Sequence, residues 1–90
     1  MVSSIKLFWK KDCVKCPAAK EIFNGLKNKN LMTQEFDMNT VDGLAEGAFY
    51  SVLSTPTMLA IDENDNEILA WRGVVPTMQE VNEALYSKEN

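Results

Sequence analysis

The amino-acid sequence predicts an α/β fold with the element order βαβαββα. Two strand-like runs are each followed by apolar residues at helical spacing, and a polar turn separates two further strand-like runs. Strands joined through a helix pair in parallel by a right-handed crossover, whereas a hairpin adds an antiparallel strand. The 90 residues therefore favour a single domain, residues 1–90, in which three helices flank a four-stranded mixed sheet.

The first helix is predicted after the apolar, strand-like run Ile5–Trp9. From Cys16 onward apolar residues keep helical spacing, and the polar stretch 27–30 ends the pattern. A second strand follows at Met32–Met38, where side chains alternate with a period of two. The face of the first helix that should be buried contains Ala19, Ile22, Phe23 and Leu26.

The second helix is predicted at Val41–Leu53, with Asn39 or Thr40 as its N-cap. Gly43 and Gly47 should weaken this helix, because glycine is a poor helix former. Its apolar face is expected to consist of the residues at helical spacing, which are Val41, Leu44, Ala45, Ala48, Phe49, Val52 and Leu53.

A hairpin and a third helix complete the pattern. Thr57–Ile61 and Ile68–Trp71 are the expected strands, and the polar residues 62–66 form the turn between them. In the last helix, Thr77 and Glu80 have the spacing of a capping box. Its buried face should contain Met78, Val81 and Leu85.

The two cysteines of the chain, Cys13 and Cys16, stand three positions apart directly after the first strand. We expect the first helix to begin at Cys13, where unpaired N–H groups and the helix dipole would favour a thiolate. The helical pattern turns Cys16 inward beside Ala19. In a reducing cytosol such a pair is more often catalytic or metal-binding than a permanent crosslink. The pair is therefore the predicted redox site.

Charge and hydropathy exclude several classes of partner. Nucleic acids and anionic membranes bind clustered basic faces, and neither is expected as a partner of a chain with a net charge of −4. No apolar run approaches the roughly 18 residues of a membrane span. The N-terminus has no signal-peptide pattern. We expect a cytoplasmic protein that acts as a monomer.

The motif residues resemble those of a known family. Cys13-Val14-Lys15-Cys16 after the first strand and Thr55-Pro56-Thr57 before the third are similar to the CxxC motif and cis-proline of small thioredoxin-fold redoxins. That group includes thioredoxins, glutaredoxins and the glutaredoxin-like donors of electrons to ribonucleotide reductase. The resemblance covers nearly the whole chain, and it implies a thioredoxin-like fold with a cis peptide bond between Thr55 and Pro56.

The resemblance also implies an activity and its participants. Cys13 would attack a substrate disulfide, and Cys16 would resolve the mixed disulfide. No cofactor is implied beyond the redox-active disulfide of this pair. The implied partners are disulfide-bearing protein substrates and a recharging enzyme of the thioredoxin reductase type. Thr55, ahead of Pro56, would present its backbone to the substrate as to an added strand.

Charged residues surround the predicted nucleophile. Lys10, Lys11 and Lys15 would favour the Cys13 thiolate, while Asp12 would oppose it. The alternative is that these charges only solvate an exposed loop. The predicted substrate-contacting set is Asp12, Lys15, Thr55 and Pro56.

Two departures from the family patterns bear on the mechanism. Leu7 stands where thioredoxins bury an aspartate that assists proton transfer, and the chain has no histidine to replace it. Arg72-Gly73-Val74-Val75 follows the fourth strand, in place of the Gly-Gly and aspartate with which glutaredoxins hold glutathione. Glutathione binding is therefore not expected.

A second class of function would use the same cysteines. Copper chaperones also place a CxxC motif after a first strand, and two thiolates suit a soft Cu(I) ion. An iron–sulfur cluster shared by two chains through paired thiolates is a further alternative. A closed zinc site within one chain is excluded, because two cysteines and no histidine are available for four positions.

Overall fold

The computed structural model describes residues 2–28 and 31–89, and its element order confirms the predicted βαβαββα. The strands are β1 (Val2–Trp9), β2 (Met32–Asp37), β3 (Thr57–Asp62) and β4 (Glu67–Arg72). The helices are α1 (Cys16–Gly25), α2 (Val41–Phe49) and α3 (Met78–Glu89), and a 3₁₀ turn, η1 (Leu26–Asn28), follows α1. Of the polar stretch 27–30 that is predicted to end the first helix, residues 29 and 30 lie outside the described residues.

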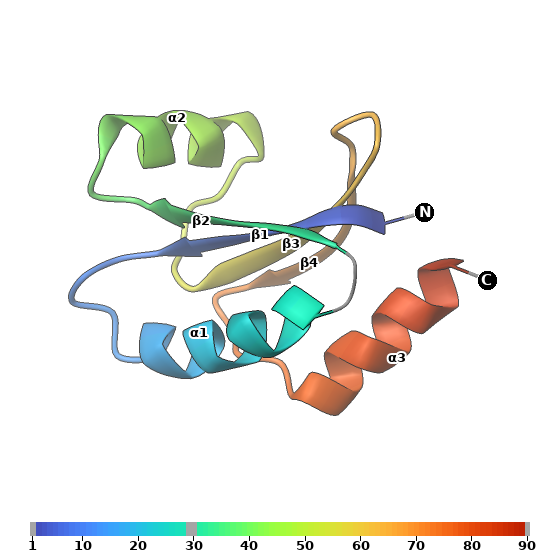
Figure 1. Ribbon diagram of the computed structural model, residues 1–90. Helices are drawn as coiled ribbons and strands as arrows, with labels where there is room; N and C mark the ends of the chain where they lie inside the picture. The colour runs from blue at the N-terminus through green and yellow to red at the C-terminus, as the bar shows by residue number, and fades with distance from the viewer. Residues whose placement is uncertain (1, 29–30, 90) are drawn as a thin grey trace.

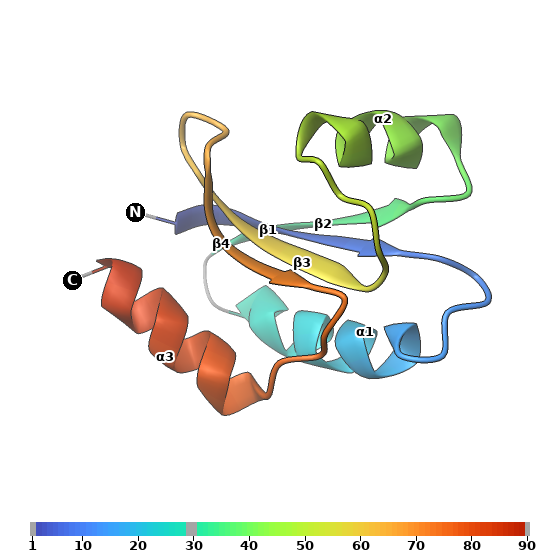
Figure 2. The same cartoon turned by 180° about the vertical axis from the view of Figure 1, so that it is seen from behind.

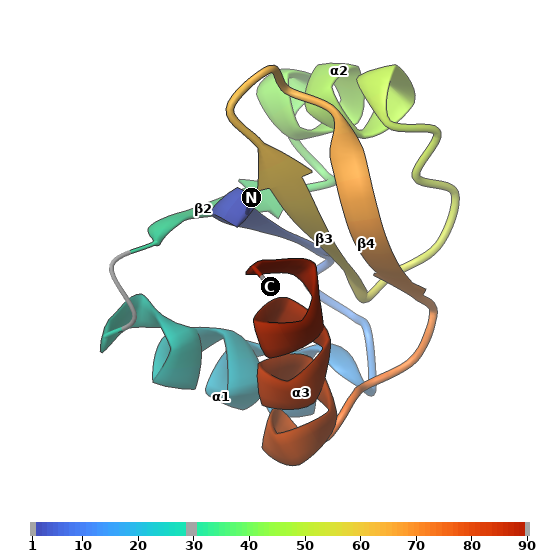
Figure 3. The ribbon, with the colours of Figure 1, turned by 90° about the vertical axis from the view of Figure 1, so that its right-hand side faces the viewer.

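The four strands form one mixed sheet in the order β2-β1-β3-β4. β1 pairs with β2 in parallel, and β3 pairs with both β1 and β4 in antiparallel. α2 covers one face of the sheet, and α1 and α3 cover the other (Figures 1 and 2). The view from the side shows the same three layers (Figure 3). The predicted α/β class, the four-stranded mixed sheet and the three flanking helices are thus confirmed.

Two hydrophobic cores lie on opposite faces of the sheet, because successive side chains of a strand point to opposite sides. Ile5 and Leu7 of β1 belong to the core shared with α1 and α3, and Phe8 belongs to the core on the side of α2. The buried faces predicted for the first and last helices are confirmed at Ala19, Phe23, Leu26, Val81 and Leu85. Ile22 and Met78 are only partly buried against this core.

The N-terminus of α3 has the predicted capping box. The Glu80 N–H donates to Thr77 Oγ1 at 3.1 Å, and the Thr77 N–H donates to Glu80 Oε1 at 3.3 Å. These two bonds satisfy amides that a helix start otherwise leaves without partners.

The buried face of α2 differs from the prediction. Gly43 and Gly47 are the buried residues of this helix. A Cβ atom at Gly43 would overlap the backbone carbonyl of Asp37, so the backbone of α2 lies directly against the end of β2. The predicted apolar face is wrong because the close approach of two backbones decides which side is buried. Its members Val41, Leu44, Ala45, Ala48, Phe49 and Leu53 are exposed.

Capping motifs define both the start and the end of α2. Thr40 is the N-cap, since its Oγ1 accepts a hydrogen bond from the Gly43 N–H at 3.0 Å. At the other end the Val52 N–H donates to the Gly47 carbonyl at 2.8 Å, and Ser51 has a left-handed φ of 57°. This pattern is a Schellman motif, which ends the helix at Phe49 and not at the predicted Leu53. Val52 is buried, as predicted.

A glycine-to-alanine pair tests the contact between α2 and β2. Gly43→Ala should destabilise the protein by about 1–3 kcal/mol, the cost of overpacking a filled site, although alanine favours helices by about 1 kcal/mol. Gly47→Ala is the matched control, because the nearest atom to its Cβ is Met38 Cε at 2.7 Å, the end of a flexible side chain. Urea unfolding measures both variants against the unmodified chain. Equal stability of the two variants would contradict the backbone contact at Gly43.

A buried cation also connects α2 to the sheet. The ammonium of Lys6, in β1, pairs with the carboxylate of Glu46 in α2. It lies 5.4 Å from the ring centroid of Phe36 and 5.2 Å from that of Tyr50.

None of the helices in the described part of the chain is long and apolar enough to cross a lipid bilayer.

Candidate active site

The strand register brings three connecting segments to one edge of the sheet. Trp9, the last residue of β1, is paired with Asp37, the last residue of β2, and Phe8 is paired with Thr57, the first residue of β3. The β1–α1 loop, the residues after β2 and the segment before β3 therefore meet at this edge (Figure 1). In open α/β sheets, binding sites form beyond the carboxyl ends of parallel strands.

Cys13 and Cys16 form a disulfide at this edge, with their Cα atoms 5.3 Å apart. Cys16 is the first residue of α1 and only 2% of its surface is exposed, as the helical pattern predicts. Cys13, in the loop before α1, is half-buried and is the more accessible of the two sulfur-bearing residues. An attacking group from solvent therefore meets Cys13 first.

α1 begins at Cys16 and not at Cys13, so the predicted start of the helix is wrong. Lys15 is the N-cap, and the Cys16 N–H donates to the Cys13 carbonyl at 3.3 Å within a turn. Pro17, in the first turn of the helix, has no N–H to offer. The helix terminus therefore presents fewer N–H groups to Cys13 than the sequence argument assumes. The ammonium groups of nearby lysines therefore place more positive charge beside the cysteine pair than the N-terminus of α1 does.

A groove of about 310 Å³ runs beside Cys13, and we refer to it as the Thr55 groove. Three of the four predicted substrate-contacting residues, Asp12, Lys15 and Thr55, line it. The fourth, Pro56, is buried and does not line it. The further lining residues are Lys10, Val14 and Asn39. Of these, the sequence places only Lys10 beside Cys13, and it predicts substrate contact for none of the three.

Two of those lining residues had a signal in the sequence. Asn39 comes just after the parallel neighbour of β1, which places it at the same edge of the sheet as the cysteines. Val14 lies between the two cysteines and is 95% exposed, so it is an apolar side chain presented to solvent at the rim of the Thr55 groove.

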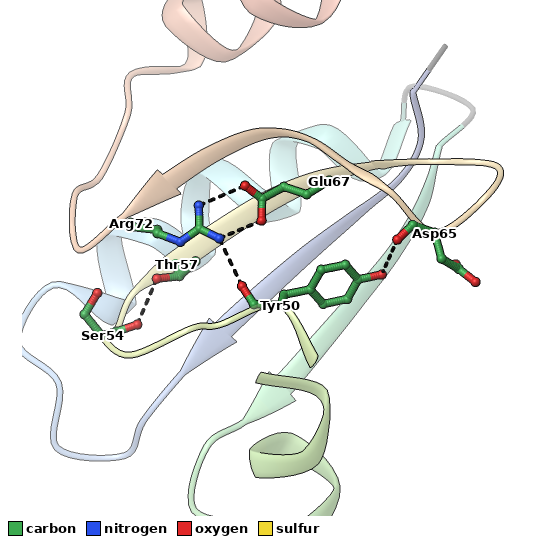
Figure 4. A network of polar contacts seen from close by, with 6 residues as sticks. All are labelled: Tyr50, Ser54, Thr57, Asp65, Glu67 and Arg72. Atoms are coloured by element: carbon green, nitrogen blue, oxygen red, sulfur yellow. Dashed lines mark hydrogen bonds and ion pairs between the residues drawn. The ribbon is translucent and has the colours of Figure 1, made fainter. Parts of the chain in front are cut away.

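Hydrogen bonds position the segment that carries Thr55. The peptide bond between Thr55 and Pro56 is cis, the isomer that the sequence resemblance implies. The Gly73 N–H donates to the Pro56 carbonyl at 2.8 Å, and Thr57 Oγ1 donates to the Ser54 carbonyl at 2.8 Å. Figure 4 shows the second of these bonds at the bend before β3.

The start of the same segment is attached to β4. Arg72 donates to the Tyr50 carbonyl at 3.0 Å and to the two carboxylate oxygens of Glu67 at 3.0 and 2.6 Å (Figure 4). Hydrogen bonding to Glu67 raises the pKa of Arg72 above its ordinary value. The Tyr50 hydroxyl donates to the Asp65 carbonyl at 3.1 Å, and burial raises the pKa of Tyr50, so this hydroxyl stays protonated at neutral pH. The polar contacts thus fix both ends of the segment.

A second hollow, of about 200 Å³, also borders the disulfide, and we call it the lysine hollow. It is lined by Trp9, Lys10, Lys11, Cys13, Cys16, Pro17 and Lys20. The Lys20 ammonium lies 3.4 Å from the centroid of the Trp9 ring and 4.0 Å from Glu35 Oε1. Lys20 is not among the predicted site residues, although its place one helical turn after Cys16 puts both on one face of α1.

Leu7 is fully buried in the core that contains Ala19 and Phe23 of α1. The position at which the sequence resemblance implies an aspartate in thioredoxins is therefore surrounded by apolar side chains in this chain. Among the described residues no carboxylate lines the lysine hollow beside Cys16, and Asp12 lies in the Thr55 groove instead.

Comparison with solved structures identifies the fold. A reduced thioredoxin pre-protein from Schistosoma mansoni superimposes with a TM-score of 0.75 at 18% identity, covering 93% of this chain and 76% of that chain. Oxidised thioredoxin O2 from Arabidopsis thaliana gives 0.77 at 16% identity, covering 96% and 74%. A structure described as a malarial protein gives 0.79 at 14% identity, covering 97% of each chain. This chain has the thioredoxin fold.

The thioredoxin fold is the architecture that the sequence resemblance implies, and it is recognised here from the structure. No protein-family model matches the sequence, and no curated protein matches it. Within the thioredoxin fold of this chain, the cysteine pair occupies the junction of β1 and α1, and Thr55 precedes β3 beside it.

Proposed function

We propose that the chain is a thiol–disulfide oxidoreductase that carries electrons to disulfide-bearing proteins. One observation carries this proposal. A half-buried Cys13, open to a groove, is joined to a buried Cys16, only 2% exposed, at the β1–α1 junction of a thioredoxin fold. A pair arranged in this way can exchange a disulfide with a partner through one sulfur and complete the exchange through the other.

The proposed reaction begins with the reduced pair. The Cys13 thiolate attacks one sulfur of the substrate disulfide, and the other substrate sulfur leaves as a thiolate. Cys16 loses its proton and attacks Cys13 Sγ, which breaks the mixed disulfide and releases the second substrate thiolate. Two electrons pass from the pair to the substrate, and the Cys13–Cys16 disulfide forms. The two substrate thiolates take up the proton released by Cys16 and a second proton from solvent.

The Thr55 groove supports an assignment for substrate binding. The backbone N–H and C=O of Thr55 have no hydrogen-bond partner among residues 2–28 and 31–89. An extended substrate segment could pair with them as an added strand, which would hold its disulfide against Cys13. Asp12 and Lys15 line the same groove and would contact side chains of that segment. Pro56 does not line the groove, and its role would be to hold Thr55 in position there.

We assign the recharging of the disulfide to a flavoenzyme of the thioredoxin reductase type in the cytoplasm. A coupled assay tests this assignment with a model disulfide such as insulin. One arm supplies NADPH and thioredoxin reductase, and the other supplies NADPH, glutathione and glutathione reductase. We expect NADPH consumption in the first arm at a rate at least about tenfold above that in the second. Turnover only in the glutathione arm would overturn the assignment, and turnover in neither arm would overturn the oxidoreductase proposal.

Metal handling by the same two thiols stays a prediction of the sequence. An absorbance spectrum of protein purified without oxygen distinguishes it from redox exchange. Cu(I)–thiolate or iron–sulfur charge-transfer bands would support the metal alternative, whereas a spectrum of aromatic residues alone fits the dithiol–disulfide carrier.

A further inference from the structure

The basic residues of the chain gather around the disulfide. Residues 10–20 contain four of the nine basic residues and one acidic residue, Asp12, so this segment carries +3 in a chain of net charge −4. The rest of the chain therefore carries −7. Lys10, Lys11 and Lys15 are exposed, and none of them forms an ion pair within the described part of the chain. Their charge is available to a partner.

The lysine hollow is the most basic part of this surface. Three of its lining residues are lysines and two are the redox cysteines, whereas the Thr55 groove combines Lys10 and Lys15 with the carboxylate of Asp12. Lys20 is held over the ring of Trp9, with its ammonium 3.4 Å from the ring centroid. A cation that is already fixed loses little rotamer freedom when it binds an anion.

We propose that the lysine hollow binds carboxylates of an acidic protein segment next to the substrate disulfide. The inference rests on the proposed function and names its preferred substrates, which are disulfides flanked by aspartate or glutamate. It adds no chemical step, because the carboxylates bind while the sulfur atoms exchange as described above.

The position of the hollow favours carboxylates close to the substrate cysteines. Cys13 and Cys16 both line it, so an anion bound by Lys20 lies next to the reacting sulfurs. The charge of −7 on the rest of the chain repels an acidic partner from the other faces. A basic active-site edge on an acidic molecule orients the encounter and raises the association rate, and salt screens this effect.

Three peptide disulfides that differ only at the positions flanking cystine test the inference. These positions hold glutamate, glutamine or lysine. The reduced protein is mixed with each peptide at pH 7, samples are quenched by alkylation, and mass spectrometry gives the second-order rate of exchange. At 20 mM salt the glutamate peptide should react about tenfold faster than the glutamine peptide, and the lysine peptide should be slowest. At 0.5 M salt the three rates should converge.

Charge variants assign the preference to the lysine hollow. Lys11→Gln and Lys20→Gln should each reduce the ratio of the glutamate rate to the glutamine rate by about threefold or more. Lys20→Arg should keep the ratio, because arginine also carries its charge over an aromatic ring. Lys88→Gln, at an exposed residue in the last turn of α3, removes the same charge and should leave the ratio unchanged, because that end of α3 lies at the opposite side of the molecule from the start of α1 (Figure 1). A change in thiol pKa alters the rates of all peptides together, so the ratio reports recognition.

The possible results separate this inference from the proposed function. Equal rates for the three peptides at low salt would overturn the acidic preference and leave the oxidoreductase activity standing. A glutamate preference that Lys20→Gln and Lys88→Gln reduce equally would also overturn it, because the effect would then come from net charge alone. Absence of exchange with every peptide would overturn both.

Discussion

Cys16→Ser should convert the protein into a trap for its substrates, whereas Cys13→Ser should neither reduce nor retain them. Cys16 is 2% exposed, so a protein disulfide cannot reach its sulfur, and Cys13 opens to the Thr55 groove. Without Cys16 the mixed disulfide on Cys13 has no resolving thiol. Disulfide reduction by both variants should fall to background. Non-reducing gels with an immobilised bait measure the trapped complexes.

A matched experiment on the unmodified chain assigns the nucleophile without a mutation. After reduction, iodoacetamide at pH 6 should label Cys13 faster than Cys16, as mass spectrometry of the peptides would show. Lys10, Lys11 and Lys15 lie beside Cys13 and favour its thiolate, and Cys16 is covered. Equal labelling rates, or trapping by Cys13→Ser in place of Cys16→Ser, would reverse the two roles.

Leu7→Asp should destabilise the protein by a few kcal/mol and yet accelerate the resolving step. Leu7 is fully buried among apolar side chains, and a carboxyl there has no described partner. The new carboxylate, on the α1 side of the sheet, would accept the proton of Cys16. No carboxylate of residues 2–28 and 31–89 lines the lysine hollow and could take this role in the unmodified chain. We expect resolution of the mixed disulfide to become about tenfold faster at neutral pH.

The pH dependence of stability identifies the buried carboxyl. Burial raises the pKa of a carboxyl in the folded state above its unfolded value, so the folded state binds the proton more tightly. The variant should therefore lose stability as the pH rises from about 4 to 7, relative to the neutral control Leu7→Asn. Asp12→Asn should leave the resolution rate unchanged, because Asp12 lines the Thr55 groove and not the hollow beside Cys16. A large loss on Asp12→Asn would make Asp12 the base.

The sequence alone predicted the elements whose signals come from residues close together in the chain. Alternating side chains predicted β2, apolar runs predicted the other strands, and the spacing of Thr77 and Glu80 predicted the cap that starts α3. The inward position of Cys16 followed from its place one turn before Ala19 in an amphipathic helix. In each case a few neighbouring residues determine the geometry.

Contacts between one element and the next, and the geometry of the turns that join them, could not be obtained in this way. The buried face of α2 depends on the approach of Gly43 to the backbone of Asp37, which outweighs the periodicity of Leu44 and Phe49. The start of α1 depends on the turn that carries Cys13, and a turn has no strong period. The role of Lys20 appears only when β1 brings the ring of Trp9 beneath its ammonium.

The reduction potential of the Cys13–Cys16 pair distinguishes an electron carrier from a protein with a structural disulfide. Protein equilibrated in thiol–disulfide buffers of graded potential is quenched by acid, alkylated and weighed by mass spectrometry to give the fraction of dithiol. We expect a reversible two-electron transition between about −120 and −270 mV, the range of catalytic thioredoxin-fold pairs. A potential below about −300 mV, which is typical of structural disulfides, would show that the pair is a permanent crosslink and not an electron carrier.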